Sequence, residues 1–432
     1  MKTIERTLLR ASLASLALAG AATPALAAGG LMSSLLVAPT PVADDHEAPA
    51  IRAIAADVLY TAAGDPIENG AVAIADGKIT GVAPGTADLK VAAITPGLVD
   101  LSVRIDTGAY SVEQTDETPA HLSVAEALDL FSYRWDRELR SGVTTVLANP
   151  SDEAVIGGFG VVLKTGGDPT LDARQLKGDA VLRGSMGSQP SSGNRTPRGS
   201  QPSTFYFRRP TTRMGVEWVA RDAFWDAVNA RKAGDLGEGE TKAKNEVLLK
   251  VIDGELPFSV QAWATQDIRT AIFLKEEFGI PNMFVDAGAE AWREPEMLVR
   301  SGLGVVLPPH TWNGRTGDGA WFALDCAAKL DELGVSFALS AHGNADIGNR
   351  LGRQAGYAMR GGLSHEKALE AVTIAPARMV GVDDRVGSIE VGKDADLVLW
   401  NGTPFEATSR VIGVVLNGRL VVDPRAAGGE AQ

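Results

Sequence analysis

The middle of the 432-residue chain alternates short apolar runs with longer segments in which apolar residues recur at helical spacing. The apolar runs are GLVDLSV (97–103), VTTVLAN (143–149), VVLK (161–164), AVLRG (180–184), FSVQAWA (258–264), NMFVDAG (282–288), VVLPP (305–309) and SFALSAH (336–342). Runs that are apolar throughout are typical of strands buried on both faces, and helices between them indicate a parallel α/β fold. About eight such units predict a (β/α)8 barrel of the TIM type over residues 96–385.

Both ends of the chain show a different pattern, in which short alternating runs are separated by turn residues. Asp76-Gly77 lies between the runs AVAI and KITGV, and this dipeptide predicts a tight hairpin. Near the end, LVLW and VIGVVL are followed by Asn417-Gly418 and then RLVV. Because the termini of domains often lie close together, we expect residues 51–95 and 386–425 to form one composite β-sandwich.

Residues 1–27 have the pattern of a secretory signal peptide. Basic residues precede an apolar, alanine-rich run, and Ala25-Leu26-Ala27 matches a small-x-small cleavage site. We therefore expect a cleaved Sec-type signal peptide, a linker over residues 28–50, and a periplasmic or secreted mature protein. The apolar run is shorter than the roughly 20 residues of a spanning helix, so no membrane span is expected after cleavage. An uncleaved N-terminal anchor is the alternative.

Composition and charge narrow the classes of partner. Hydrophobic residues make up 45% of the chain, which is enough to bury a large core. The net charge of −13 disfavours nucleic acid and anionic membranes as partners. The single cysteine, Cys326, excludes internal disulfides and lies in the apolar helical pattern WFALDCAAKL, which predicts a buried structural thiol rather than a nucleophile.

One long segment, residues 185–215, is irregular and contains no acidic residue. It follows a predicted barrel strand, so it would lie on the face of the barrel that carries active sites. Long loops in compact domains are often lids or binding loops. We therefore expect a basic lid that carries Arg195, Arg198, Arg208, Arg209 and Arg213.

Three stretches carry a resemblance to a known family. ITPGLVDLSVRIDTG (94–108) resembles the first barrel strand of the amidohydrolase superfamily, and SGVTTVLANP resembles its second strand. The tail matches the family's closing motif most specifically, at Gly387, Ile389, Gly392, Lys393, Ala395, Asp396 and Leu397. IGGFGVVLKT and PTTRMGV look like an imidazolonepropionase-like, exported bacterial subgroup. The resemblance covers roughly residues 51–423 and implies a (β/α)8 barrel with a composite β-sandwich that hydrolyses C–N or related bonds with one or two divalent metals.

The resemblance also shows where this chain departs from the family. The positions that hold metal ligands in the family are here Ser102 and Arg104 on the first strand, Gln261 and Trp263 on the fifth, Ala287 on the sixth and Ala341 on the eighth. A guanidinium is a permanent cation and cannot ligate a metal. We therefore expect no metal cofactor, although the family would use Zn or another divalent ion to activate water. These six residues would then line a remade pocket.

Three residues remain candidates for catalysis. His342 could serve as a general base and Lys164 as a pocket amine or nucleophile, and Asp286 is the third candidate. A structural role is preferred for two of them: His342 as a hydrogen-bonded rim histidine whose side chain faces away from the neighbouring Ala341 position, and Lys164 as a solvated lysine at a strand end. Ser102 and Arg104 either bind an anionic group or reflect drift, with Arg104 paired to Asp106 or Asp286.

The sequence thus supports three hypotheses of function. The first is an exported, catalytically impaired homologue that binds a small molecule or forms a homo-oligomer or a hetero-oligomer with an intact amidohydrolase. The second is an active hydrolase of C–N bonds with a relocated or metal-free site. The third is a structural component of the envelope. Fold alone does not choose among them.

Overall fold

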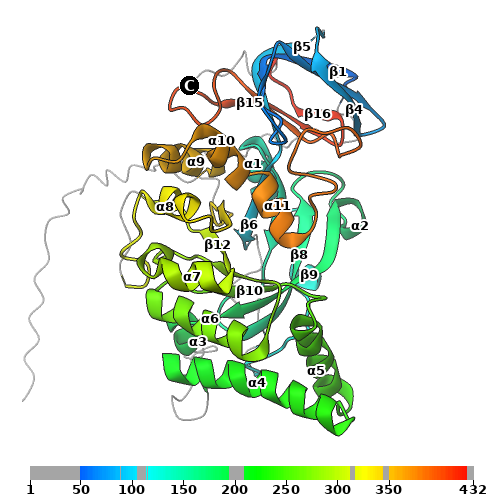
Figure 1. The fold of residues 1–432 in the computed structure, drawn as a ribbon. Helices are drawn as coiled ribbons and strands as arrows, with labels where there is room; N and C mark the ends of the chain where they lie inside the picture. The colour runs from blue at the N-terminus through cyan, green and yellow to red at the C-terminus, as the bar shows by residue number, and fades with distance from the viewer. Residues whose placement is uncertain are drawn as a thin grey trace, which may run out of the picture. The chain divides into compact units, whose positions relative to one another are not determined.

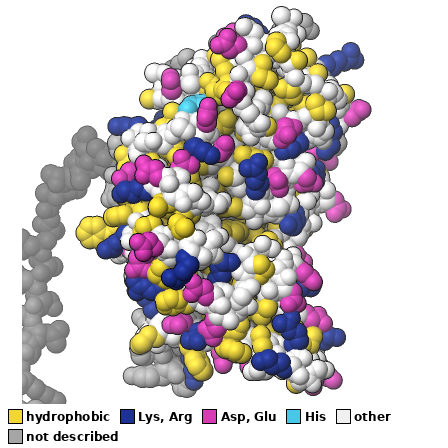
Figure 2. All heavy atoms as spheres, viewed as in Figure 1, with side chains coloured by type: hydrophobic (Ala, Val, Ile, Leu, Met, Phe, Trp, Pro, Cys, Tyr) yellow, Lys and Arg dark blue, Asp and Glu magenta, His cyan; other side chains and the backbone are white. Residues whose placement is uncertain are grey.

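The structure is a computed structural model that describes residues 49–87, 89–104, 113, 115–193, 209–311, 317–343 and 350–425. The predicted signal peptide, 1–27, lies outside these residues. Among the residues described, no helix combines the length and apolar character needed to cross a membrane. Figure 2 shows acidic and basic side chains interspersed over the visible face.

The barrel is built on an eight-stranded sheet in which the strands follow one another in chain order. Its strands are β6 (Leu98–Val103), β7 (Val143–Ala148), β8 (Ile156–Lys164), β9 (Gln175–Ser185), β10 (Phe258–Gln261), β11 (Met283–Asp286), β12 (Gly304–Leu307) and β13 (Phe337–Leu339). These are the predicted apolar runs, and the TIM-type α/β fold is confirmed. The expectation of an all-parallel sheet is wrong for one strand, because β8 pairs antiparallel with both β7 and β9. The connection from β8 to β9 holds only the four-residue helix α2 (Leu171–Arg174), whereas a parallel crossover needs a dozen or more residues.

The side chain of Asp100 joins the two ends of this sheet. Asp100 lies on β6, and its carboxylate accepts hydrogen bonds from the Ser340 hydroxyl at 2.6 Å and the Ala341 N–H at 2.8 Å, both just after β13. It also accepts the N–H of Ser102 at 3.0 Å. Burial raises the pKa of Asp100, and the hydrogen bonds to its carboxylate oppose that rise. A carboxylate thus provides part of the closure between β6 and β13.

Helices follow most strands and supply the outer layer. Figure 1 shows α4, α6 and α7 along one flank of the strands, and α4 packs on α6 as α6 packs on α7. Except for α5 (Gly239–Ile252), with 14 residues, the remaining helices are short. One hydrophobic cluster joins strands of the barrel to Ala377 and Val380 of α11. The helices are η1 (Val124–Ala127), α1 (Tyr133–Arg140), α2, α3 (Ser188–Gly193), α4 (Arg213–Ala233), α5 (Gly239–Ile252), α6 (Thr265–Phe278), η2 (Ala291–Arg293), α7 (Pro295–Ser301), α8 (Cys326–Glu332), α9 (Leu351–Arg360), α10 (His365–Ala371) and α11 (Ile374–Val380).

A second eight-stranded sheet contains strands from both ends of the chain. The early strands are β1 (Ala53–Leu59), β2 (Ile67–Glu68), β3 (Gly70–Ala75), β4 (Lys78–Pro84) and β5 (Leu89–Pro96), and the late ones are β14 (Leu397–Trp400), β15 (Val411–Leu416) and β16 (Arg419–Val422). The two groups meet where β5 pairs antiparallel with β14. Side chains from both groups share one hydrophobic cluster, so the sheet packs upon itself.

Two tight turns of this sheet are those predicted by their dipeptides. Asp76-Gly77 connects β3 to β4 with φ values of 50° and 75°, and Asn417-Gly418 connects β15 to β16 with φ values of 48° and 73°. Positive φ at both central positions is the requirement of the type I′ turn, which explains the choice of residues. The Asn417 turn also contacts the Gly77 turn, where an added Cβ at Gly77 would lie 3.1 Å from the Asn417 carbonyl oxygen.

A buried ion cluster links the barrel sheet to the second sheet. The ammonium of Lys164, at the end of β8, lies 2.8 Å from Asp394 and 3.0 Å from Asp396. Its side chain is 2% exposed, so the expectation of a solvated strand-end lysine is wrong. Asp394 and Asp396 belong to the tail motif, and the Asp396 carbonyl also accepts the N–H of Gly97, next to β6. The most specific motif in the sequence therefore holds the architecture together.

We predict that Lys164→Met lowers the free energy of unfolding by about 3–5 kcal/mol, because it leaves two buried carboxylates short of a cation. Lys90→Met is the control: Lys90 pairs with Asp57 at the exposed surface, so about 1 kcal/mol or less should be lost. Urea denaturation measures both. Equal losses would contradict the assignment.

The same cluster gives a pH signature. Burial opposes ionisation of Asp394, but Lys164 together with Lys78 and Arg385 lowers its pKa. The ionised Asp394 side chain therefore contributes fully to stability above the pKa of an unfolded aspartate, about 3.9. This contribution is lost as the pH falls through the lower pKa of Asp394 in the folded state. The difference between wild type and Lys164→Met should shrink in that acidic range.

Candidate functional site

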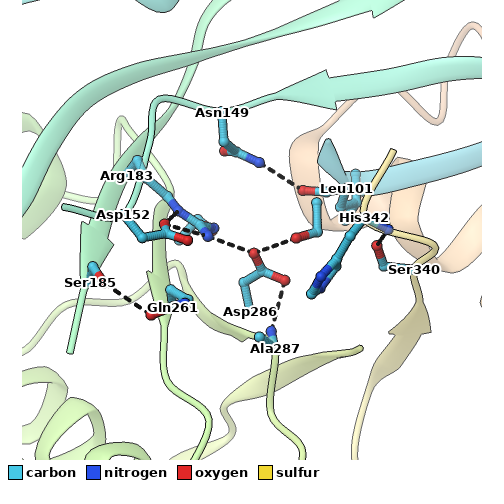
Figure 3. Close-up of polar contacts among 12 residues, drawn as sticks. Leu101, Asn149, Asp152, Arg183, Ser185, Gln261, Asp286, Ala287, Ser340 and His342 are labelled. Atoms are coloured by element: carbon cyan, nitrogen blue, oxygen red, sulfur yellow. Dashed lines mark hydrogen bonds and ion pairs between the residues drawn. The ribbon is translucent and has the colours of Figure 1, made fainter. Parts of the chain in front are cut away.

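The carboxyl ends of the barrel strands carry a buried polar network centred on Arg183 (Figure 3). The Arg183 side chain, on β9, is 1% exposed. Its Nε donates to Asp152 Oδ1 at 2.9 Å, and its Nη2 lies 2.9 Å from the same oxygen and 2.7 Å from Asp286 Oδ2. Its Nη1 donates to the Ser259 hydroxyl at 2.9 Å. One guanidinium therefore contacts two carboxylates and a hydroxyl at once.

Asp286, at the end of β11, is fully engaged by protein groups. Its Oδ1 accepts the N–H of Ala287 at 2.7 Å, and its Oδ2 accepts the Ser102 hydroxyl at 2.7 Å as well as pairing with Arg183. Burial alone would raise the pKa of Asp286, but the charges of Arg183 and His342 lower it below the ordinary value. Asp286 is therefore an ionised acceptor near neutral pH and a poor proton acceptor.

Arg104 pairs with Asp152, through Oδ2 of that carboxylate. This corrects the expected partner: Asp286 is held by Arg183 instead, and Asp106 lies outside the described residues. Asp152 follows β7 and is itself 0% exposed, whereas the Arg104 side chain is 30% exposed. Arg104 is therefore the part of this network that reaches toward solvent.

His342 lies with Asp286, contrary to the expectation that it faces away. Figure 3 shows its imidazole directed toward Asp286 and Ala287. The reason is local: β13 ends at Leu339, and His342 has a φ of 56°, so the alternation of a strand does not extend to this position. The ring packs edge-on against Trp263 with centroids 5.5 Å apart.

The other residues at the family's ligand positions are buried rather than open to a pocket. Ser102 is 2% exposed, and Gln261, Ala287 and Ala341 are 0% exposed. Both polar atoms of the Gln261 side-chain amide form hydrogen bonds: Oε1 accepts the Ser185 hydroxyl at 3.0 Å, and Nε2 donates to Gln189. Three of the residues predicted at the strand ends are partly exposed, namely Arg104, Trp263 and His342.

The structure does not bring Lys164 to this site. Lys164 pairs with Thr145 near the start of β7, because β8 runs antiparallel, and so it lies at the opposite end of the strands from Asp286. Its predicted role as a pocket amine therefore fails on position. Arg183 and Asp152 were missed from sequence, although an arginine inside the apolar run AVLRG was a visible signal.

The predicted lid is only partly described. Arg195, Arg198 and Arg208 lie outside the described residues, and Arg209 is exposed. Arg213 starts α4 and pairs with Asp267 at 2.9 Å and with Asp318 at 2.5 Å. Part of the segment expected to be irregular forms the short helix α3.

The donor set can be tested against the divalent metal that the resemblance implies. In the part of the chain that the structure describes, no three His, Cys, Asp or Glu side chains converge as a metal-binding group. Two carboxylates at the strand ends, those of Asp286 and Asp152, lie close together, and the guanidinium of Arg183 already contacts both. Like charges repel strongly when buried, so this arrangement does not fit a divalent cation.

Comparisons with known proteins place these features in context. A family model described as "Amidohydrolase family" matches residues 324–421. The crystal structure of an amidohydrolase from Thermotoga maritima MSB8 has a TM-score of 0.74 and 29% identity, and the match covers 85% of this chain and 99% of that one.

Two of the curated relatives that match by sequence illustrate the range of these matches. Amidohydrolase tasK from Hapsidospora irregularis is 25% identical over 315 residues, and an imidazolonepropionase from Shewanella frigidimarina is 43% identical over 68 residues. The matches cover 65% and 14% of this chain. They span only 31% and 17% of those two proteins.

Cys326 is buried, as expected, and burial raises its pKa to about 12. Because the thiolate is the reactive form, we predict that the folded protein does not react with a disulfide-exchange reagent near neutral pH. The same protein in urea should react with one equivalent, since Cys326 is its single cysteine. Absorbance of the released thiol measures both, and rapid reaction of the folded protein would contradict a buried structural role.

Proposed function

The chain belongs to the amidohydrolase superfamily, and from this premise we propose that it is an exported member that has lost metal-dependent hydrolysis and binds a small anionic molecule at the mouth of its barrel. Such a protein would act alone or as the partner subunit of an intact homologue. The whole-protein activities of the relatives are not transferred, because the chain matches less than a third of the length of the curated ones.

The observation that carries the proposal is that both carboxylate oxygens of Asp286 already have protein partners. Both of its oxygens are held by protein donors, from Ala287, Ser102 and Arg183. A carboxylate that served as metal ligand would need an accessible lone pair, and one that served as proton shuttle would also need a pKa within reach of neutrality. The lowered pKa of Asp286 and its 0% exposure support a structural anion instead.

Arg104 supplies the support for an anionic ligand. It is bound to Asp152 through one terminal nitrogen, while a guanidinium has five N–H donors in total. The remaining donors on a partly exposed side chain suit a carboxylate or phosphate, which bind guanidinium groups through paired hydrogen bonds. Trp263 and His342, also partly exposed, would give such a ligand aromatic neighbours.

We predict that the purified wild-type protein holds well under one equivalent of Zn, Mn or Fe, and that its melting temperature rises with members of a carboxylate panel of dicarboxylates and N-acyl amino acids. Arg104→Gln should weaken that binding by about tenfold or more, since it removes a charge-assisted contact. Arg221→Gln, which alters an exposed arginine of α4, is the control.

Elemental analysis and thermal shift titration make these measurements. One or more tightly held metal ions per chain, with hydrolysis that stops on chelation, would overturn the proposal. Co-purification with an intact homologue would select the partner role within it.

A metal-free hydrolase is the second candidate, favoured by the proximity of His342 and Asp286. A carboxylate beside an imidazole can orient it as a general base. Ser102, however, donates its hydroxyl to Asp286 at 2.7 Å, so the serine is not held by the imidazole as a nucleophile would be.

If acyl-dipeptides, cyclic amides or lactones are turned over, His342→Ala should lower kcat/KM by about 100-fold or more, because a general base contributes at least that much. Lys90→Met, which alters an exposed lysine of the second sheet, serves as the control and should leave kcat/KM near the wild-type value. A measured turnover that survives His342→Ala would remove this candidate.

A further inference from the structure

Two of the fully buried carboxylates at the carboxyl ends of the barrel strands share one arginine. Asp152 and Asp286 are both 0% exposed, and a buried carboxylate without a compensating charge is strongly unfavourable. Arg104 pairs with Asp152 and is 30% exposed. Arg183 is the buried cation that contacts both carboxylates.

The contacts of Arg183 also span the sheet. From β9 its guanidinium reaches Asp152 in the loop after β7, Ser259 on β10 and Asp286 on β11. Asp286 in turn holds the hydroxyl of Ser102, which lies on β6. A resident metal ion would hold groups from several strands together in the same way, through one central positive charge.

We propose that the Arg183 guanidinium is a built-in substitute for a metal ion, and that the chain keeps a latent divalent-cation site that opens when this side chain is removed. The inference rests on the proposed loss of the metal site and deepens it. It assigns Arg183 the role of a positioning residue, which fixes the two carboxylates independently of any ion from solution.

The chemistry of the latent site follows from its donors. Removal of the guanidinium would leave carboxylate oxygens of Asp152 and Asp286, with the Ser102 hydroxyl beside them. Oxygen ligands with room for water suit Mg²⁺ and Mn²⁺, which are often held by one or two carboxylates. Zn²⁺ would be a poorer fit, because it favours imidazole and thiolate ligands.

The test compares Arg183→Met with wild type in chelator and in millimolar Mn²⁺. In chelator the variant should melt roughly 5 °C or more below wild type, because two buried carboxylates lose their cation. Mn²⁺ should restore a substantial part of that loss, and the variant should bind Mn²⁺ in an electron paramagnetic resonance titration. Wild type should show neither a rise in melting temperature with Mn²⁺ nor Mn²⁺ binding.

Two further variants separate charge from packing. Arg174→Met is the matched control, because Arg174 is also buried and donates to the carbonyl oxygens of Gly167 and Asp168. It should lose stability without any response to Mn²⁺. Arg183→Lys keeps the charge but not the planar fork, so its melting temperature should fall between wild type and Arg183→Met.

If Arg183→Met does not fold in chelator, the double variant Arg183→Met/Asp286→Asn tests the inference instead, because it also removes one of the uncompensated charges. This double variant should fold and bind Mn²⁺ more weakly than Arg183→Met prepared with Mn²⁺. An Arg183→Met protein that neither loses stability nor binds Mn²⁺, with metal-free wild type, would overturn this inference and leave the proposed function intact. Metal in the wild-type protein would overturn the proposed function itself.

Discussion

The burial of Asp152 and Asp286 is the constraint on which the carboxyl end of this barrel depends. Neither side chain has contact with solvent, and both contact the guanidinium of Arg183 that lies between them. Removing one partner of a buried ion pair leaves an uncompensated buried charge and strongly destabilises the fold. The side chains of Asp152, Asp286 and Arg183 therefore behave as one unit. Ser102, Ala287 and His342 are arranged around the Asp286 end of that unit.

The opposite end of the strands uses the same physical solution with different residues. There the cation is Lys164, and the anions are Asp394 and Asp396 of the tail motif. This cluster connects the antiparallel strand β8 to the segment that precedes β14, and so ties the barrel to the sheet formed from both chain ends. A resemblance carried largely by this motif therefore reports on the fold, whereas the proposed function depends on the separate network around Arg183.

The sequence predicted the fold well where local chemistry decides it. The apolar runs became strands, and the Asp76-Gly77 and Asn417-Gly418 turns have the backbone that their residues require. It did not predict the direction of β8, because an apolar run reads the same in either direction.

The site was predicted less completely. Ser102, Gln261, Ala287 and Ala341 were located by resemblance, but their burial depends on tertiary packing. His342 was assigned to the wrong face because strand alternation was extended beyond the end of β13. Arg183 and Asp152 were missed because the partner of a buried charge lies far away in the sequence, and only the folded chain brings the two together.

The most direct measurement of the central claim is an anomalous difference map from crystals of the wild-type protein soaked in Mn²⁺. The account predicts density for the Arg183 guanidinium between Asp152 and Asp286 and no anomalous peak beside either carboxylate. A strong peak coordinated by Asp286, with the arginine displaced, would contradict it.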